Sequence, residues 1–282
     1  MIRSLWTAAS GMMAQQTNLD TVANNLANVN TPGFKKSKAG FQDLLYDSVS
    51  ASAPPPNTSP QTYLTDPTAG YPTPPALQQV GHGVRVAGTS RSFLPGTYES
   101  TANTLDLAID GAGFFCVVMQ DGKLAYTRDG SFRLSGNRRL VTSDGHLVSS
   151  QGSQSGSQAG ISVPEGTTKV TIGTGGEVRA TTTSGETACG TIGISVFPNP
   201  PGLEALGHNL FKETPASGAP KHLTPASEGA GTLLSGYLET SNVQVVEEMV
   251  NLIVIQRAYE MNAKSVQSSD EVLAITNGLI RR

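Results

Sequence analysis

The chain lacks long apolar runs, and its charge is nearly balanced. Its hydrophobic stretches are a few residues long, as at residues 252–255, whereas about 20 are needed to cross a bilayer. The 19 basic and 22 acidic residues give a net charge of −3, which is not the basic field that attracts nucleic acid. The start has no apolar segment followed by a small-residue cleavage site. We therefore expect no membrane span, no nucleic-acid partner and no cleavable signal peptide.

Residues that carry chemistry are also scarce. The two cysteines are Cys116, which lies in an apolar run and is expected to be buried, and Cys189, and a disulfide between them stays open. The four histidines are more than ten residues apart, so no local metal pair exists. No glycine cluster completes a phosphate or dinucleotide motif, and there is no nucleophile elbow. We expect no catalytic residue, no metal and no cofactor.

The first hydrophobic pattern has a helical period. Apolar residues recur at steps of three and four, which is typical of a helix that packs along one stripe. This helix cannot pass Asn30, because Pro32 lacks a donor N–H and Gly33 favours the positive φ of a turn. The sequence therefore predicts a helix over residues 2–29. Its stripe consists of Ile2, Leu5, Ala9, Met12, Gln16, Leu19, Ala23 and Leu26.

Four asparagines crowd the end of this helix: Asn24, Asn25, Asn28 and Asn30. Asparagine is a mediocre helix former. Its use here indicates side chains that hydrogen-bond to a neighbouring backbone or fix a helix register. An ordinary polar face that ends in an Asx turn is the alternative. A shorter amphipathic piece, residues 41–46, follows the turn.

Two later segments are unlike a folded core. Residues 47–79 contain eight prolines among Ser, Ala and Thr, which is typical of an extended arm. Residues 152–160 contain only Gly, Ser, Gln and Ala, which predicts a flexible loop.

The middle of the chain, residues 80–232, has the period of strands. Asp-Gly pairs recur at 110–111, 121–122, 129–130 and 144–145, and Asp-Gly is a strong hairpin signal because it tolerates positive φ. Further strand candidates are residues 169–172, 177–180 and 192–197. Short strands at this spacing predict an all-β unit.

A helical period returns after residue 236. Six apolar residues recur every seven positions: Val245, Leu252, Tyr259, Val266, Leu273 and Ile280. The companion position four residues after Val245 is half polar, because Met249 and Ala263 alternate there with Gln256, Asp270 and Asn277. Ser241 and Asn242 are candidate N-caps of this helix.

These patterns predict an α+β protein. A discontinuous coiled-coil domain of N- and C-terminal helices is joined to a central all-β domain by an extended Pro-rich arm. The expected segments are 1–46, 47–79, 80–232 and 233–282. Neither terminal helix has enough neighbouring sequence to bury its stripe, so we expect the two to pack on each other and then on other copies.

Several motifs are similar to those of one known family. Residues 22–35, VANNLANVNTPGFK, resemble the N-terminal signature of the bacterial flagellar rod and hook proteins. Residues 238–243, 247–253 and 256–264 resemble the C-terminal helix of that family. Residues 81–86, 125–132 and 202–214 are most similar to its distal-rod members.

The resemblance implies a structural subunit of the flagellar basal body, a distal rod that transmits motor torque to the hook. Such proteins are exported through the flagellar type III apparatus. In the periplasm they polymerise into a hollow helical tube, lined by the terminal helices. Proximal rod subunits, hook subunits and basal-body ring proteins would be neighbours.

Residues expected to contact other subunits come from both ends of the chain. In the first helix and its turn they are Leu5, Met12, Leu19, Asn24, Asn25, Leu26, Asn28, Asn30, Pro32, Gly33 and Phe34. In the last helix they are Val245, Met249, Leu252, Gln256, Tyr259, Asn262, Val266, Leu273 and Ile280.

Two alternatives stay open on the sequence. The first is a hook or proximal-rod subunit of the same family. The second is an adhesive or ligand-binding β-domain whose end helices fold back on each other as an intramolecular hairpin.

Overall fold

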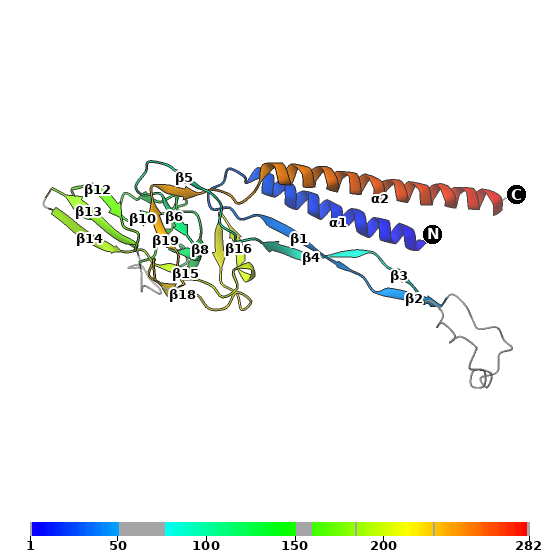
Figure 1. Cartoon of the computed structure of the whole chain (residues 1–282), viewed down its shortest axis with the longest axis horizontal. Helices are drawn as coiled ribbons and strands as arrows, with labels where there is room; N and C mark the ends of the chain where they lie inside the picture. Colours follow the sequence, from blue (N-terminus) through cyan, green and yellow to red (C-terminus); the bar gives the residue numbers. More distant parts are fainter. Residues whose placement is uncertain (1, 51–76, 151–159, 184, 228, 281–282) are drawn as a thin grey trace, which may run out of the picture. The chain divides into compact units, whose positions relative to one another are not determined.

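The computed structural model describes residues 2–50, 77–150, 160–183, 185–227 and 229–280. A helix opens the chain, strands follow, and a second helix closes it (Figure 1), so the fold is α+β as expected. The chain forms two compact units, each made of separate stretches of sequence. Unit 1 contains Met1–Asp20, Ala39–Thr89 and Leu252–Arg282, and unit 2 contains Thr21–Lys38 and Ser90–Asn251.

The two long helices are α1 (Ile2–Ala27) and α2 (Val245–Ile280). Both confirm the helical periods of the sequence. The first helix ends two residues earlier than expected, where the Asn28 side chain donates to the Asn24 carbonyl (2.9 Å). Within unit 1 the two helices lie side by side and antiparallel (Figure 1).

The expected N-caps of α2 are wrong. The helix begins at Val245, and the first intrahelical bond runs from Glu248 N to the Gln244 carbonyl (3.0 Å). Asn242 is engaged elsewhere, since its side chain accepts from Lys36 N (2.8 Å) and donates to the Ser92 carbonyl (2.9 Å).

Four strands accompany the helices. Strand β1 (Ser37–Asp43) pairs with β4 (Val84–Arg91), and β2 (Tyr46–Ser50) pairs with β3 (Leu77–Gly81) in antiparallel register. The amphipathic piece at residues 41–46 therefore belongs to the end of β1, the start of β2 and the two residues between them. The expected arm, 47–79, begins and ends in the β2–β3 ladder, and residues 51–76 lie outside the described part of the chain.

Unit 2 is built on a nine-stranded sheet with the order β16-β17-β8-β7-β11-β10-β9, and β15 bridges β7 to β18. A three-stranded sheet, β12-β13-β14, and the pairs β19–β6 and β20–β5 complete it. The strands from β5 to β12 are Tyr98–Ser100, Leu107–Asp110, Phe114–Val118, Leu124–Thr127, Arg133–Leu134, Leu140–Val141, Leu147–Val148 and Thr167–Ile172. Those from β13 to β20 are Glu177–Thr182, Gly185–Thr191, Ile194–Val196, Glu204–Gly207, Leu210–Lys212, Lys221–Leu223, Thr232–Ser235 and Tyr237–Glu239.

The strand candidates of the sequence are confirmed at β12, β13 and β15, whereas only two of the four Asp-Gly pairs close hairpins. Residues 121–122 join β7 to β8, and residues 144–145 join β10 to β11. Strand β6 pairs with β19 instead of β7. Residues 110–111 therefore connect two strands that are not paired with each other. Residues 129–130 likewise lie between β8 and β9, which are not paired with each other. Residues 151–159, which include most of the expected glycine-serine loop, lie outside the described residues.

Three clusters of buried side chains form the core in the described part of unit 2. The largest includes Leu107, Ile109, Phe115 and Ile192, and the smallest consists of Val117, Ala125 and Leu210. The second is aromatic: Phe114 stands edge-on to Phe197 with ring centroids 5.7 Å apart. Cys116 is buried in this second cluster, as expected, and both cysteines are free. Burial raises the pKa of the Cys116 thiol to about 11.

Candidate assembly surface and its junction

The contact between α1 and α2 in unit 1 includes small and polar residues. A Cβ at Gly11 would lie 2.9 Å from Nδ2 of Asn262, so a larger residue there would displace the Asn262 amide. Nearer the end of the pair, the hydroxyls of Ser4 and Ser269 are 3.5 Å apart. At these two places the helices approach each other through residues without large side chains.

The expected stripe of α1 lies at the flank of its buried face. Leu5, Met12 and Leu19 are half-buried, as is Leu26 in unit 2. The fully buried positions are occupied by Ala8, Ala14 and Val22. Two large side chains of the same helix, Trp6 and Met13, are 72% and 71% exposed.

The expected stripe of α2 divides in the same way. Leu252, Asn262, Val266 and Leu273 are half-buried, whereas Val245, Met249, Gln256 and Tyr259 are exposed. The companion position is one residue earlier than expected, because the less exposed residues are Glu248, Ile255, Asn262, Ser269 and Thr276. The Ile280 side chain lies outside the described residues. Met249 and Gln256 stay predictions as contacts with another copy.

A ridge of apolar side chains runs along the outer side of α2. Within unit 1 it consists of Val254, Met261, Val272, Ile275 and Leu279, which we call the α2 ridge. The spacing of seven, eleven, three and four residues keeps them on one face. Exposed apolar side chains gathered on one face mark an interaction site in a protein that folds in water.

The asparagine-rich end of α1 forms a junction in unit 2. Asn25 is buried, and its amide pairs with the backbone of Ser37: Nδ2 donates to the carbonyl (2.8 Å), and Oδ1 accepts from N (2.9 Å). This confirms, for Asn25, the expected bond to a neighbouring backbone. Asn28 instead bonds locally, accepting from Thr31 Oγ1 (3.2 Å). Asn24 and Asn30 are exposed.

The turn after α1 is held against the strands. Gly33 has φ +69°, as expected, and a Cβ there would lie 2.6 Å from the backbone N of Asp129. The preceding Pro32 carbonyl accepts from the side chain of Asn209 (3.0 Å). Phe34 is buried. Glycine is therefore required at position 33 for two reasons: the positive φ, and the lack of space for a Cβ beside Asp129.

Three charged side chains meet inside this junction. Lys35 Nζ lies 2.5 Å from Glu239 Oε1, and both side chains are fully buried. Arg128, also buried, lies 3.3 Å from Glu239 Oε2 and donates to the carbonyl of Gly111 (2.8 Å). Desolvation lowers the pKa of Lys35, opposed by the charge of Glu239. We call Lys35, Arg128 and Glu239 the buried triad.

The triad joins three motifs that are far apart in sequence. Lys35 ends the segment after α1, Arg128 belongs to residues 125–132, and Glu239 precedes α2. The sequence singled out the segments but missed the triad. The available signal was a charged residue inside each motif, next to residues with apolar or turn character.

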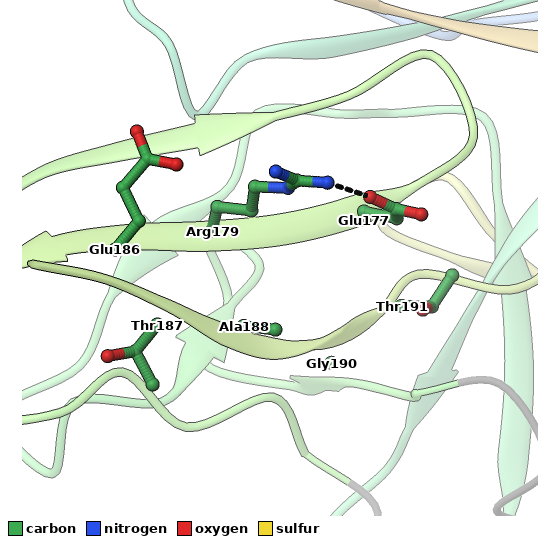
Figure 2. A pocket seen from close by; sticks show the side chains of 7 residues that line it. All are labelled: Glu177, Arg179, Glu186, Thr187, Ala188, Gly190 and Thr191. Atoms are coloured by element: carbon green, nitrogen blue, oxygen red, sulfur yellow. Dashed lines mark hydrogen bonds and ion pairs between the residues drawn. The ribbon is translucent and has the colours of Figure 1, made fainter.

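Unit 2 also has an open hollow over β13 and β14. Figure 2 shows the short side chain of Ala188 and the bare backbone of Gly190 there, with Glu186 at one side. On the neighbouring strand β13, Glu177 and Arg179 form an exposed ion pair at 2.8 Å. Among the described residues, no group of three or more His, Cys, Asp or Glu could hold a metal ion. No helix in the described part of the chain is long and apolar enough to cross a membrane.

Comparisons with known proteins agree with these motifs. Residues 5–35 match the family model "Flagella basal body rod protein", and residues 108–180 match "Flagellar hook protein FlgE/F/G D1 domain". Residues 234–279 match "Flagellar basal body rod FlgEFG protein C-terminal".

Full-length relatives carry one name, flagellar basal-body rod protein FlgG. The chain is 46% identical to that of Borreliella burgdorferi over 100% of both chains. It is 40% identical to that of Caulobacter vibrioides over 99% of both, and 37% identical to that of Bacillus subtilis over 97% of both. A flagellar hook protein FlgE of Helicobacter mustelae matches only 52% of this chain and 30% of its own length. The chain belongs to the FlgG family of flagellar basal-body rod proteins.

Proposed function

We propose that this chain is a structural subunit of the flagellar distal rod, and that it assembles through its terminal helices into a hollow helical shaft. The observation that carries this proposal is the exposed α2 ridge, together with the exposed Trp6 and Met13 of α1. These large apolar side chains are exposed in the single chain, so they are available for contacts with other copies. The names of the full-length relatives support the same role.

The hook and proximal-rod alternatives are not favoured. The hook relative covers about half of this chain, whereas the rod relatives cover nearly all of it. The relatives are named as rod proteins, and the proposal includes no enzymatic step and no cofactor.

The proposal extends to location and neighbours. The rod would stand in the periplasm, reached through the flagellar type III apparatus. Its ends would meet proximal rod and hook subunits, and basal-body ring proteins would surround it. The coiled-coil contact of the terminal helices and a packing role for the Pro-rich arm belong to the same proposal.

Complementation tests this function. The gene is expressed in a motile bacterium that lacks its own FlgG protein, and basal bodies are purified and imaged by electron microscopy. We expect rods of normal length and restored swimming. Basal bodies that stop before the distal rod, although the chain is expressed and exported, would contradict the proposal.

A further inference from the structure

Unit 1 carries a groove between α1 and β4. It has a volume of about 540 Å³. Apolar side chains line it, mainly Met13 and Ala14 of α1 with Val84 and Val86 of β4. Asp20 stands at one end on α1, and Arg85 of β4, which donates to Gln42 Oε1 (2.8 Å), also lines the groove. We call this the α1–β4 groove.

The groove has the length of a short piece of helix. Its α1 wall runs from Ser10 to Asp20, about 15 Å at 1.5 Å per residue. A stretch of α2 from Val254 to Lys264 has the same length. Within that stretch Val254 and Met261 project from the outer face, and Met261 is 65% exposed.

Charge also matches between the two surfaces. Arg257 follows the first ridge residue by three positions, so it lies beside the ridge on the same face. Asp20 and Arg257 are exposed, and neither forms an ion pair with another described residue. A basic side chain beside the ridge thus faces an acidic one at the end of the groove once the ridge is seated.

The geometry points to one occupant: the α2 ridge of a second copy, with Met261 in the groove and Arg257 paired with Asp20. This inference rests on the proposed function. In a helical polymer every copy has the same inclination to the axis, so a neighbouring α2 runs antiparallel to α1, as the chain's own α2 does. That direction brings Arg257, not Lys264, to the Asp20 end.

The contact is heterologous, because groove and ridge are different surfaces of one chain. Such a contact leaves a free groove at one end and a free ridge at the other, so it repeats without closing unless the rotation makes a ring. This contact therefore predicts a polymer and not an isolated symmetric dimer.

Charge reversal tests the pairing. Asp20→Arg and Arg257→Asp are each expected to raise the critical concentration for polymer formation at least about tenfold, because like charges then meet at the contact. The double variant restores the opposite charges and should return it to within about threefold of the original chain. Both residues are exposed, so circular dichroism should show unchanged folding. Additive losses in the double variant would overturn the pairing.

Cysteine cross-linking tests the location. Thr17→Cys, in the groove, and Met261→Cys, on the ridge, are made in separate chains and mixed before assembly. We expect a disulfide-linked dimer in the polymer, well above the background of the unmodified chain with its two native cysteines. Met249→Cys, on another face of α2, should stay at background when mixed with Thr17→Cys.

The outcomes separate this inference from the function. Polymers that form without the Thr17–Met261 cross-link, or with equal cross-linking from residue 249, would overturn the groove contact and leave the rod function standing. Failure to form any polymer, together with failed complementation, would contradict both.

Discussion

Lys35 and Glu239 are an ion pair with no exposed side-chain surface, and their Nζ and Oε1 atoms are 2.5 Å apart. They come from opposite ends of the chain, 204 positions apart. Arg128 shares the same carboxylate. Because Glu239 lies between two buried cations, its carboxylate joins the segment after α1 to residues 125–132 and to the segment before α2 within unit 2.

Glu239→Gln should therefore destabilise unit 2 strongly. It leaves Lys35 and Arg128 buried without their counter-charge, and breaking a buried pair costs about 3–5 kcal/mol. Lys35→Met should cost less, since Glu239 keeps Arg128 and the N–H of Gly96 (3.0 Å). Urea unfolding followed by near-UV circular dichroism measures both. Arg179→Ala, which breaks the exposed pair with Glu177, is the control and should change nothing measurable. Equal losses for all three variants would refute the triad.

Asn25→Ala should lower the free energy of unfolding by about 1–3 kcal/mol. The change removes both hydrogen bonds to Ser37 and leaves buried backbone groups without partners. Asn24→Ala is a matched control on the same helix turn, because that side chain is exposed. Thermal unfolding of the two variants gives the comparison. If Asn24→Ala destabilises the chain as much as Asn25→Ala, the loss comes from a change in helix propensity and not from the bonds to Ser37.

Gly33→Ala separates strain from crowding. Gly33 and Gly122 have similar φ values, +69° and +74°, but a Cβ at Gly122 would meet nothing within 4 Å. Gly122→Ala should therefore cost only the backbone strain, about 1 kcal/mol. Gly33→Ala should cost clearly more, since its Cβ would press on Asp129. Urea midpoints of the two variants measure the difference, and equal midpoints would show that the turn can move.

The Cys116 thiol should make stability fall at alkaline pH. Burial raises its pKa from 9.0 to about 11, so between these values the folded chain keeps a proton that the unfolded chain releases. Unfolding free energy then decreases as pH rises from 9 to 11, by up to about 3 kcal/mol. Urea titrations from pH 8 to 10.5 measure the slope. Cys116→Ala should flatten it, and Cys189→Ala, at a half-buried site, should flatten it less. An unchanged slope in Cys116→Ala would assign the dependence to other groups.

The sequence predicted the elements whose signal is local. A heptad step is visible within one helix, so both helices were found, and alternating or β-branched runs revealed β12 and β13. Strand β1 was missed, because Ser37–Asp43 contains Lys, Gly and Gln without a clear alternation and is held by β4. The Asp-Gly pair at 110–111 shows the same limit. Its turn chemistry is correct, but β6 finds its partner in β19, more than 100 residues away.

The assembly surface was predicted in part. The heptad identified apolar stripes, but not which side of each stripe faces the other helix. Gly11 lies against Asn262 on that side, and neither residue carries weight in a hydrophobic pattern. The buried triad could not be predicted by spacing, since Lys35, Arg128 and Glu239 are about 100 residues apart and only the folded chain brings them together.

Leu19→Asp and Leu252→Asp should block polymer formation while unit 2 stays folded. Both side chains are half-buried at the flank of the helix pair, where an added carboxylate would have to be desolvated in a contact with another copy. Sedimentation of assembled material measures polymer, and near-UV circular dichroism reports the aromatic cluster of Phe114 and Phe197. Gln267→Asp, an exposed polar position of α2, adds the same charge and should assemble normally. If the two leucine variants assemble as well as Gln267→Asp, these leucines do not contribute to the subunit contact. If they lose the near-UV signal, the helices support unit 2 itself.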